Sequence, residues 1–152
     1  MDESWILIDP DSGLHVGWYF WLRVLDEANR SARYGHPFGL VLLEAEPKPG
    51  APARTIDEAT SRVPAAIRAT DLGGQLGAGR AGVVLPHQDA ASAEAATERI
   101  IDRLAHGNPG GVVWHARLLC YPGDAAEISN LLTVGWTERR TTDGRSNVEL
   151  PA

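Results

Sequence analysis

A run of four apolar residues, Leu40-Val41-Leu42-Leu43, constrains the fold of this chain more than any other feature. It lies within a predicted strand over residues 38–46 and shows no alternation between apolar and polar positions. A strand with apolar side chains on both faces must be covered on both faces. Residues 112–121 predict a second buried strand. The chain therefore requires a sheet that lies between layers of helices.

Apolar residues at helical spacing predict four helices, over residues 18–34, 55–68, 89–105 and 124–134. The second helix carries a capping-box pattern, Thr55 followed by Glu58, and Pro64 inside it is expected to kink it. Two further strands, 71–77 and 79–85, predict a hairpin around a glycine turn, and residues 146–150 predict a last edge strand.

The order of these elements is helix, strand, helix, strand, strand, helix, strand, helix, strand. Helices interleaved with a sheet that contains one hairpin predict a ferredoxin-like α/β (α+β) sandwich. We expect a central, mostly antiparallel sheet of about five strands, flanked by helices, in a single domain over residues 1–152.

The composition excludes several classes of function. The chain has 152 residues and a formal net charge of −6, so we expect no binding to nucleic acid or to an anionic membrane through long-range attraction. The first residues lack the features of a secretory signal, and no stretch approaches a membrane span. With a single cysteine, Cys120, these features predict a cytoplasmic protein. The five histidines show no ligand spacing, so no metal site is predicted.

Several segments, in their order and spacing, match a known family. They are Asp9-Pro10-Asp11-Ser12-Gly13-Leu14 with Tyr19-Phe20, Ala32-Arg33-Tyr34-Gly35-His36-Pro37, the strand from Val41 to Glu46, Arg68-Ala69-Thr70-Asp71 ahead of Gly77, Val83-Val84-Leu85-Pro86, and Tyr121-Pro122. On these residues the chain resembles a GGDEF domain, the fold of bacterial diguanylate cyclases, over nearly its whole length. The resemblance implies a nucleotidyl-cyclase sandwich and a role in cyclic di-GMP signalling.

The chain departs from the family at the positions that carry catalysis. The signature turn is replaced by Gly77-Ala78-Gly79-Arg80-Ala81, and the metal-binding strand position holds Glu44. In the family, a turn carboxylate and a strand aspartate hold the metals, and two metals need a shared set of carboxylates. An arginine beside a lone carboxylate would repel a cation. The resemblance therefore implies a degenerate, catalytically inactive domain, with no magnesium expected.

A second site of the family is retained. Arg68 and Asp71 match the R-x-x-D pair that binds cyclic di-GMP as an inhibitor in many such domains, and Arg99 falls where a helical arginine joins that pair. Arginine can grip guanine O6 and N7 or a phosphate, and a carboxylate can accept from the guanine N1 and N2 hydrogens. The resemblance thus implies a cyclic di-GMP receptor whose ligand is held by these three residues.

The same residues admit a plainer interpretation. Arg68 and Asp71 could pair with each other and close the end of a helix, and Arg99 could be an ordinary solvated residue. The chain would then be a protein-interaction or dimerisation module of the same fold that binds no nucleotide, with a protein partner or a second copy as its target. The sequence leaves both interpretations open.

Overall fold

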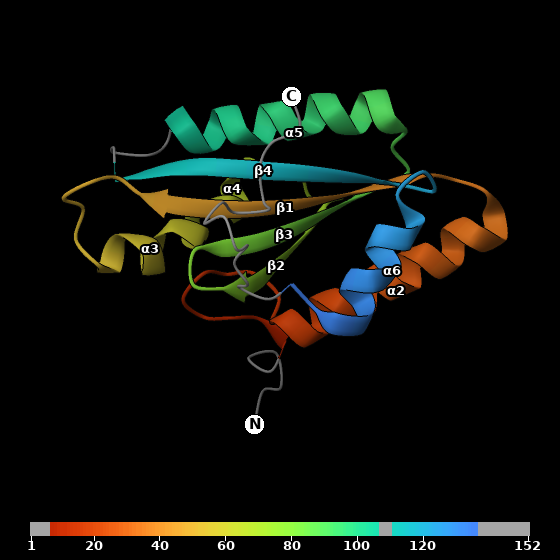
Figure 1. Cartoon of the computed structure of the whole chain (residues 1–152), viewed down its shortest axis with the longest axis horizontal. Helices are drawn as coiled ribbons and strands as arrows, with labels where there is room; N and C mark the ends of the chain where they lie inside the picture. The colour runs from red at the N-terminus through yellow and green to blue at the C-terminus, as the bar shows by residue number, and fades with distance from the viewer. Residues whose placement is uncertain (1–6, 107–110, 137–152) are drawn as a thin grey trace.

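The computed structural model describes residues 7–106 and 111–136. A single sheet of strands carries helices on both of its faces (Figure 1). The elements in chain order are α2 (Gly17–Tyr34), β1 (Phe38–Pro47), α3 (Arg54–Ala59), the 3₁₀ helix η1 (Thr60–Arg62), α4 (Val63–Ala66), β2 (Leu72–Gly77), β3 (Arg80–Pro86), α5 (Ala90–His106), β4 (Val112–Tyr121) and α6 (Ala125–Val134).

The sheet has the strand order β2-β3-β1-β4, and every neighbouring pair is antiparallel. This arrangement confirms the predicted α/β sandwich with a mostly antiparallel sheet. The described residues contribute four strands to it, against about five expected. The predicted edge strand over residues 146–150 lies outside the described residues.

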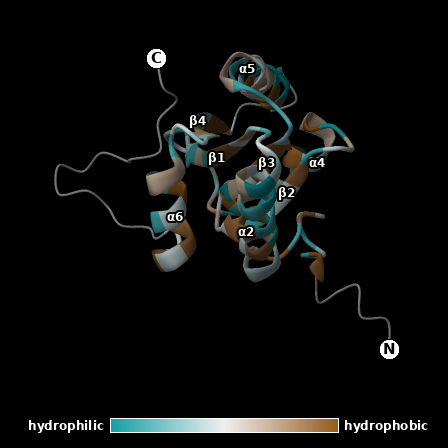
Figure 2. Cartoon of the chain, turned by 90° about the vertical axis from the view of Figure 1, so that its right-hand side faces the viewer, coloured by the Kyte–Doolittle hydropathy of each residue, from teal (hydrophilic) through white to brown (hydrophobic). Residues whose placement is uncertain are grey.

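Strand β1 shows why its sequence is apolar without interruption. Val41, Leu43 and Ala45 lie in one core, which the sheet forms with α3, α4 and α5. Phe38, Leu40 and Leu42 alternate with them and lie in a second core with α2 and α6. Successive strand residues point to opposite faces, so an apolar run supplies both cores at once. Figure 2 shows the two layers, with α5 on one side of the sheet and α2 and α6 on the other.

Helix α2 ends where the sequence predicts. Gly35 adopts φ +80°, and its N–H donates to the Ser31 carbonyl at 2.8 Å, which is the left-handed cap that glycine forms most easily. His36 and Pro37 then lead directly into β1. Within residues 7–106 and 111–136, no helix has the length and apolar character needed to cross a bilayer.

The predicted helix over residues 55–68 is wrong as a single element, because it is divided into α3, η1 and α4. Pro64 lies in the first turn of α4, where its missing N–H leaves no hydrogen bond unmade. The predicted cap is wrong as well: α3 begins after Ala53, and the N–H of Thr55 already donates to the Pro52 carbonyl at 3.0 Å.

The hairpin is confirmed, with Ala78 and Gly79 between β2 and β3. Gly79 has φ +70°, and a Cβ there would approach Ile56 at 3.1 Å and the Ala45 carbonyl oxygen at 3.3 Å. The Gly79 carbonyl accepts a hydrogen bond from the Ala45 N–H at 2.8 Å. The turn therefore lies against the end of β1, and glycine suits it through both its backbone angle and its size.

Candidate functional site

The hairpin end of the sheet holds one closely matched ion pair. Glu44 of β1 lies opposite Arg80 of β3 in the strand register, and Arg80 Nε is 3.3 Å from Glu44 Oε2. Arg80 is buried, and its guanidinium carbon lies 4.7 Å from the centre of the Trp136 ring. A buried arginine on both a carboxylate and an aromatic face neutralises the one acidic group at this position.

The turn positions that the resemblance implies to be degenerate offer no side-chain ligand atoms for a cation. Gly77, Ala78, Gly79 and Ala81 carry no side-chain oxygen or nitrogen, and Ala81 is fully buried in the core. A hard divalent cation takes oxygen ligands from carboxylates, amides and carbonyls. The side chains of Gly77, Ala78, Gly79 and Ala81 supply no such ligand, and Glu44 on the neighbouring strand β1 is contacted by Arg80.

At the opposite end of β3, Asp71 closes the turn that precedes β2. Its Oδ2 accepts the Arg68 N–H at 2.9 Å, and the Asp71 N–H donates to the Arg68 carbonyl at 3.0 Å. Asp71 is buried, and its Oδ1 has no hydrogen-bond partner in the part of the chain that the structure describes. The carboxylate thus contacts the Arg68 main chain and keeps one acceptor oxygen unused.

Arg99 lies on α5 with two nitrogens out of reach of solvent. Its Nε and Nη2 are buried and have no hydrogen-bond partner among residues 7–106 and 111–136. Burial lowers the pKa of the Arg99 guanidinium, and the positive charges of Arg68 and Arg103 lower it further, while Asp71 acts in the opposite direction. A desolvated guanidinium beside other cations is unfavourable unless an anion or acceptor completes it.

Arg68 and Arg99 line one cleft of about 410 Å³. Its walls are Arg68, Pro86, His87, Gln88, Ser92, Ala95, Ala96 and Arg99. Asp71 does not line the cleft, although its charge acts on Arg99. The structure therefore brings the two predicted arginines together in one cavity and places the aspartate within electrostatic range of them.

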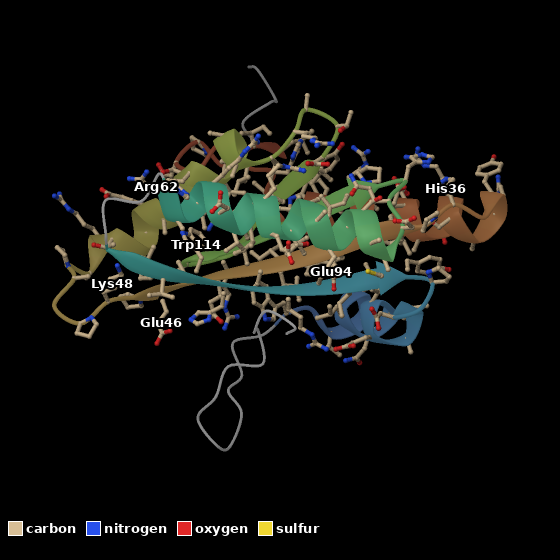
Figure 3. All side chains as sticks on the ribbon, turned by 90° about the horizontal axis from the view of Figure 1, so that it is seen from above. His36, Glu46, Lys48, Arg62, Glu94 and Trp114 are labelled. Carbon is tan, nitrogen blue, oxygen red and sulfur yellow. The ribbon has the colours of Figure 1, made fainter. Side chains whose placement is uncertain are left out.

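A larger cleft, of about 740 Å³, lies elsewhere, between the loop of residues 48–52 and α3. Its charged groups are Lys48, Glu58 and Arg62, and none of the predicted site residues lines it. Figure 3 shows Lys48 and Arg62 at one end of the molecule and His36 at the other. The larger of these two clefts is therefore not the one that contains the predicted residues Arg68 and Arg99.

Sequence reasoning missed His87, which lines the smaller cleft and has φ +58°. It also missed that His36 and His87 meet, with ring centroids 4.0 Å apart. The two histidines are 51 positions apart, so no local spacing could reveal the contact. Only the pairing of Phe38 with Pro86 at the end of the β1–β3 ladder brings them side by side.

No family model matches the chain, and no curated protein matches it in sequence. Solved structures do match. The diguanylate cyclase SiaD from Pseudomonas aeruginosa, solved with its activator SiaC, superposes with a TM-score of 0.66 and 19% identity over 85% of this chain and 57% of that chain. A DGC protein from Thermotoga maritima gives 0.64 and 14% identity over 85% of this chain and 100% of that chain. This chain has the GGDEF-domain fold.

A third match, the coiled coil and GGDEF domain of DgcB from Caulobacter crescentus in complex with c-di-GMP, has a TM-score of 0.65 and 11% identity over 84% of this chain and 77% of that chain. All three identities are low, so the likeness concerns the fold. The chain spans little more than half the length of SiaD. In this GGDEF-like fold the turn of the β2–β3 hairpin and the Arg68–Arg99 cleft lie toward opposite ends of β3.

Proposed function

We propose that residues 1–152 form one GGDEF-like domain that makes no cyclic di-GMP and binds it through Arg68, Arg99 and Asp71. The observation that carries this proposal is the Arg99 guanidinium, whose Nε and Nη2 are buried beside a second arginine without a hydrogen-bond partner in the described chain. A buried cation in that state gains the most from an anionic or acceptor-rich ligand.

The free atoms match the chemistry of the ligand. Nε and Nη2 form one edge of the guanidinium, which donates two parallel hydrogen bonds to guanine O6 and N7 or to two phosphate oxygens. Oδ1 of Asp71 is buried outside the cleft lining, and we propose that it accepts from the guanine N1 and N2 hydrogens once ligand entry exposes it. A cleft of about 410 Å³ falls within the usual size of small-molecule sites, roughly 300–1,000 Å³.

The inactivity we propose depends on the Glu44–Arg80 pair. Nucleotidyl transfer needs divalent cations to neutralise phosphate charge and activate the attacking oxygen. The Glu44 carboxylate has an arginine at 3.3 Å, and that arginine opposes the binding of a cation. With GTP and magnesium, we expect chromatography to detect no cyclic di-GMP. Sustained product formation would contradict this part of the proposal.

Calorimetric titration of the chain with cyclic di-GMP tests the receptor role. We expect saturable binding at micromolar or tighter affinity and, in Arg99→Ala and Arg68→Ala, a loss of about tenfold to a hundredfold, since a charge-assisted hydrogen bond contributes about 1.5–3 kcal/mol. Arg54→Ala, which removes an exposed arginine outside the cleft, is the matched control and should bind as the parent does. Absence of heat from the parent protein at high ligand concentration rejects the receptor role.

One observation favours a second function, a protein-interaction module. Trp18, Leu22 and Leu25 are exposed large hydrophobic residues on α2, and their spacing places them on one face of that helix. Sedimentation velocity of the parent and of Leu22→Glu tests self-association through this face. A dimer that the substitution dissociates supports it, whereas a parent protein that stays monomeric at high concentration rejects a homodimer.

A further inference from the structure

Three metal-binding side chains meet at the end of the molecule where α2 stops. Glu27 belongs to α2, His36 to the segment between α2 and β1, and His87 to the turn between β3 and α5. One ligand atom from each lies within 4.8 Å of the others. Figure 3 shows His36 beside the last turns of α2, far from Glu46 and Lys48.

Three elements of the fold bring Glu27, His36 and His87 together. Phe38 pairs with Pro86 in the sheet, so His36 and His87 extend from the same end of two adjacent strands. Their rings are in contact, with centroids 4.0 Å apart and a tilt of 30° between the ring planes. His87 holds φ +58°, a conformation uncommon for residues other than glycine, asparagine and aspartate. Glu27 completes the group from the helix that packs beneath the sheet.

Two of the three groups are buried without a partner. Glu27 is only 6% exposed, and its Oε2 accepts no hydrogen bond from residues 7–106 or 111–136. His36 Nδ1 is buried in the same unsatisfied state. Ser31, one turn further along α2, is also buried, and its hydroxyl has no partner in that part of the chain. A buried carboxylate without a partner is costly, and a bound cation would remove that cost.

We propose that Glu27, His36 and His87 form a site for a divalent transition metal of the Zn²⁺ class. Two imidazole nitrogens and one carboxylate oxygen are a donor set that suits Zn²⁺, Ni²⁺ or Co²⁺ better than Mg²⁺ or Ca²⁺, which take oxygen ligands. Three protein ligands leave the fourth tetrahedral position to water or to an added ligand. The site is separate from Glu44 and Arg80, which lie near the other end of β1.

The geometry requires only a small closure. Zn–N and Zn–O bonds of about 2.0–2.2 Å at tetrahedral angles place ligand atoms about 3.3–3.5 Å apart. The ligand atoms here lie within 4.8 Å of one another, so side-chain movements that shift these atoms by about 1 Å bring them to the separations of a tetrahedral zinc site. His87 is exposed and lies in a turn, which gives the ion access from solvent. This proposal stands independently of cyclic di-GMP binding.

Titration of the untagged, EDTA-stripped chain with ZnCl₂ tests the site. We expect one zinc per chain at micromolar or tighter affinity, with no saturable Mg²⁺ binding in the same protein. Two variants keep the local structure while removing a ligand: Glu27→Gln is isosteric, and His87→Asn retains a residue that tolerates positive φ. Each should weaken zinc binding by at least about tenfold, since a tetrahedral site loses one of its three protein ligands.

His106→Ala is the matched control, because it removes an exposed histidine that belongs to α5 and contacts Asp102. It should bind zinc within about twofold of the parent, which excludes general surface binding. Co²⁺ substitution adds a second readout, because a His/carboxylate site of low coordination number gives visible d–d absorption that His87→Asn should remove. Unchanged zinc affinity in His87→Asn, or no saturable zinc binding by the parent protein, overturns the proposal.

Discussion

At one end of the β1–β3 strand pair, Arg80 donates to Glu44 and lies over the Trp136 ring. Toward the other end of the same strand pair, Arg99, Asp71, Glu27 and His36 hold buried polar atoms without hydrogen-bond partners in the described chain. Near the first end, Gln75 Oε1 and Trp114 Nε1 are also buried without a partner in the described chain, so the difference between the two ends concerns the charged groups.

This difference shows where ligands are to be sought in a GGDEF-like fold of this kind. At the hairpin, the Arg80 guanidinium lies 3.3 Å from the Glu44 carboxylate, so these two charges satisfy each other. Near His87, each unsatisfied group costs folding free energy that a ligand could recover. Four measurements can break or sharpen the contrast, and they follow from the largest expected effect to the smallest.

Ligand-induced stabilisation should separate the two ends most clearly. Cyclic di-GMP at 100 times its dissociation constant should raise the free energy of unfolding by about 2.7 kcal/mol, because it binds only the folded state. GTP with magnesium, directed at the hairpin end, should give no such increase. Thermal melts followed by circular dichroism measure both. Equal stabilisation by the two nucleotides would remove the contrast.

Arg80→Ala should lower the free energy of unfolding by about 2 kcal/mol, since it removes the cation from a partly buried ion pair with Glu44. Urea denaturation measures the loss. Arg54→Ala should change the free energy of unfolding by less than about 0.5 kcal/mol, as expected for an exposed position. If Arg80→Ala proved as neutral as this control, the hairpin end would not be held by the ion pair.

In the absence of ligand, Arg99→Met should not lower the free energy of unfolding as Arg80→Ala does. The substitution removes a guanidinium with two buried, unpartnered nitrogens and keeps most of the apolar stem. We expect the free energy of unfolding to stay constant or rise by up to about 1 kcal/mol in the same urea experiment. A fall comparable to that of Arg80→Ala would show that Arg99 is as well satisfied as Arg80.

The smallest effect concerns Cys120, which pairs with Gly39 near the same end of β1 as His36. Burial raises the pKa of the Cys120 thiol, and the negative charges of Asp124, Glu94 and Asp89 raise it further. The thiolate is the reactive form, so at pH 8 the folded protein should react with Ellman's reagent more slowly than free cysteine. The unfolded protein should react at the ordinary rate. Faster reaction in the folded state would place a cation beside the sulfur.

The sequence alone predicted the elements whose structure depends on local patterns of residues. The uninterrupted apolar run of residues 40–43 predicts a strand buried on both faces, and alternate residues of β1 do enter two cores. The glycines of residues 77–82 predict the hairpin. The helix over residues 55–68 was not predictable in detail. Thr55 and Glu58 match the sequence pattern of a capping box, but α3 begins before Thr55, so Thr55 is not the N-cap.

The two candidate sites also differ in how far the sequence alone could predict them. Arg68 and Asp71 are three positions apart and join in one turn, and the resemblance to a family supplied Arg99. Glu27, His36 and His87 come from three elements and show no local spacing. Their meeting follows from strand register, which a single sequence does not reveal, so only the structure could suggest a metal there.

His87 has a place in both proposals, since its imidazole borders the Arg68–Arg99 cleft and also faces His36. An ion bound to that imidazole would hold it in one orientation and change the wall that a nucleotide meets. Thermodynamic reciprocity then requires that the nucleotide alter zinc affinity by the same factor as zinc alters nucleotide affinity. If both proposals hold, one side chain would couple the binding of a nucleotide to the binding of a metal ion.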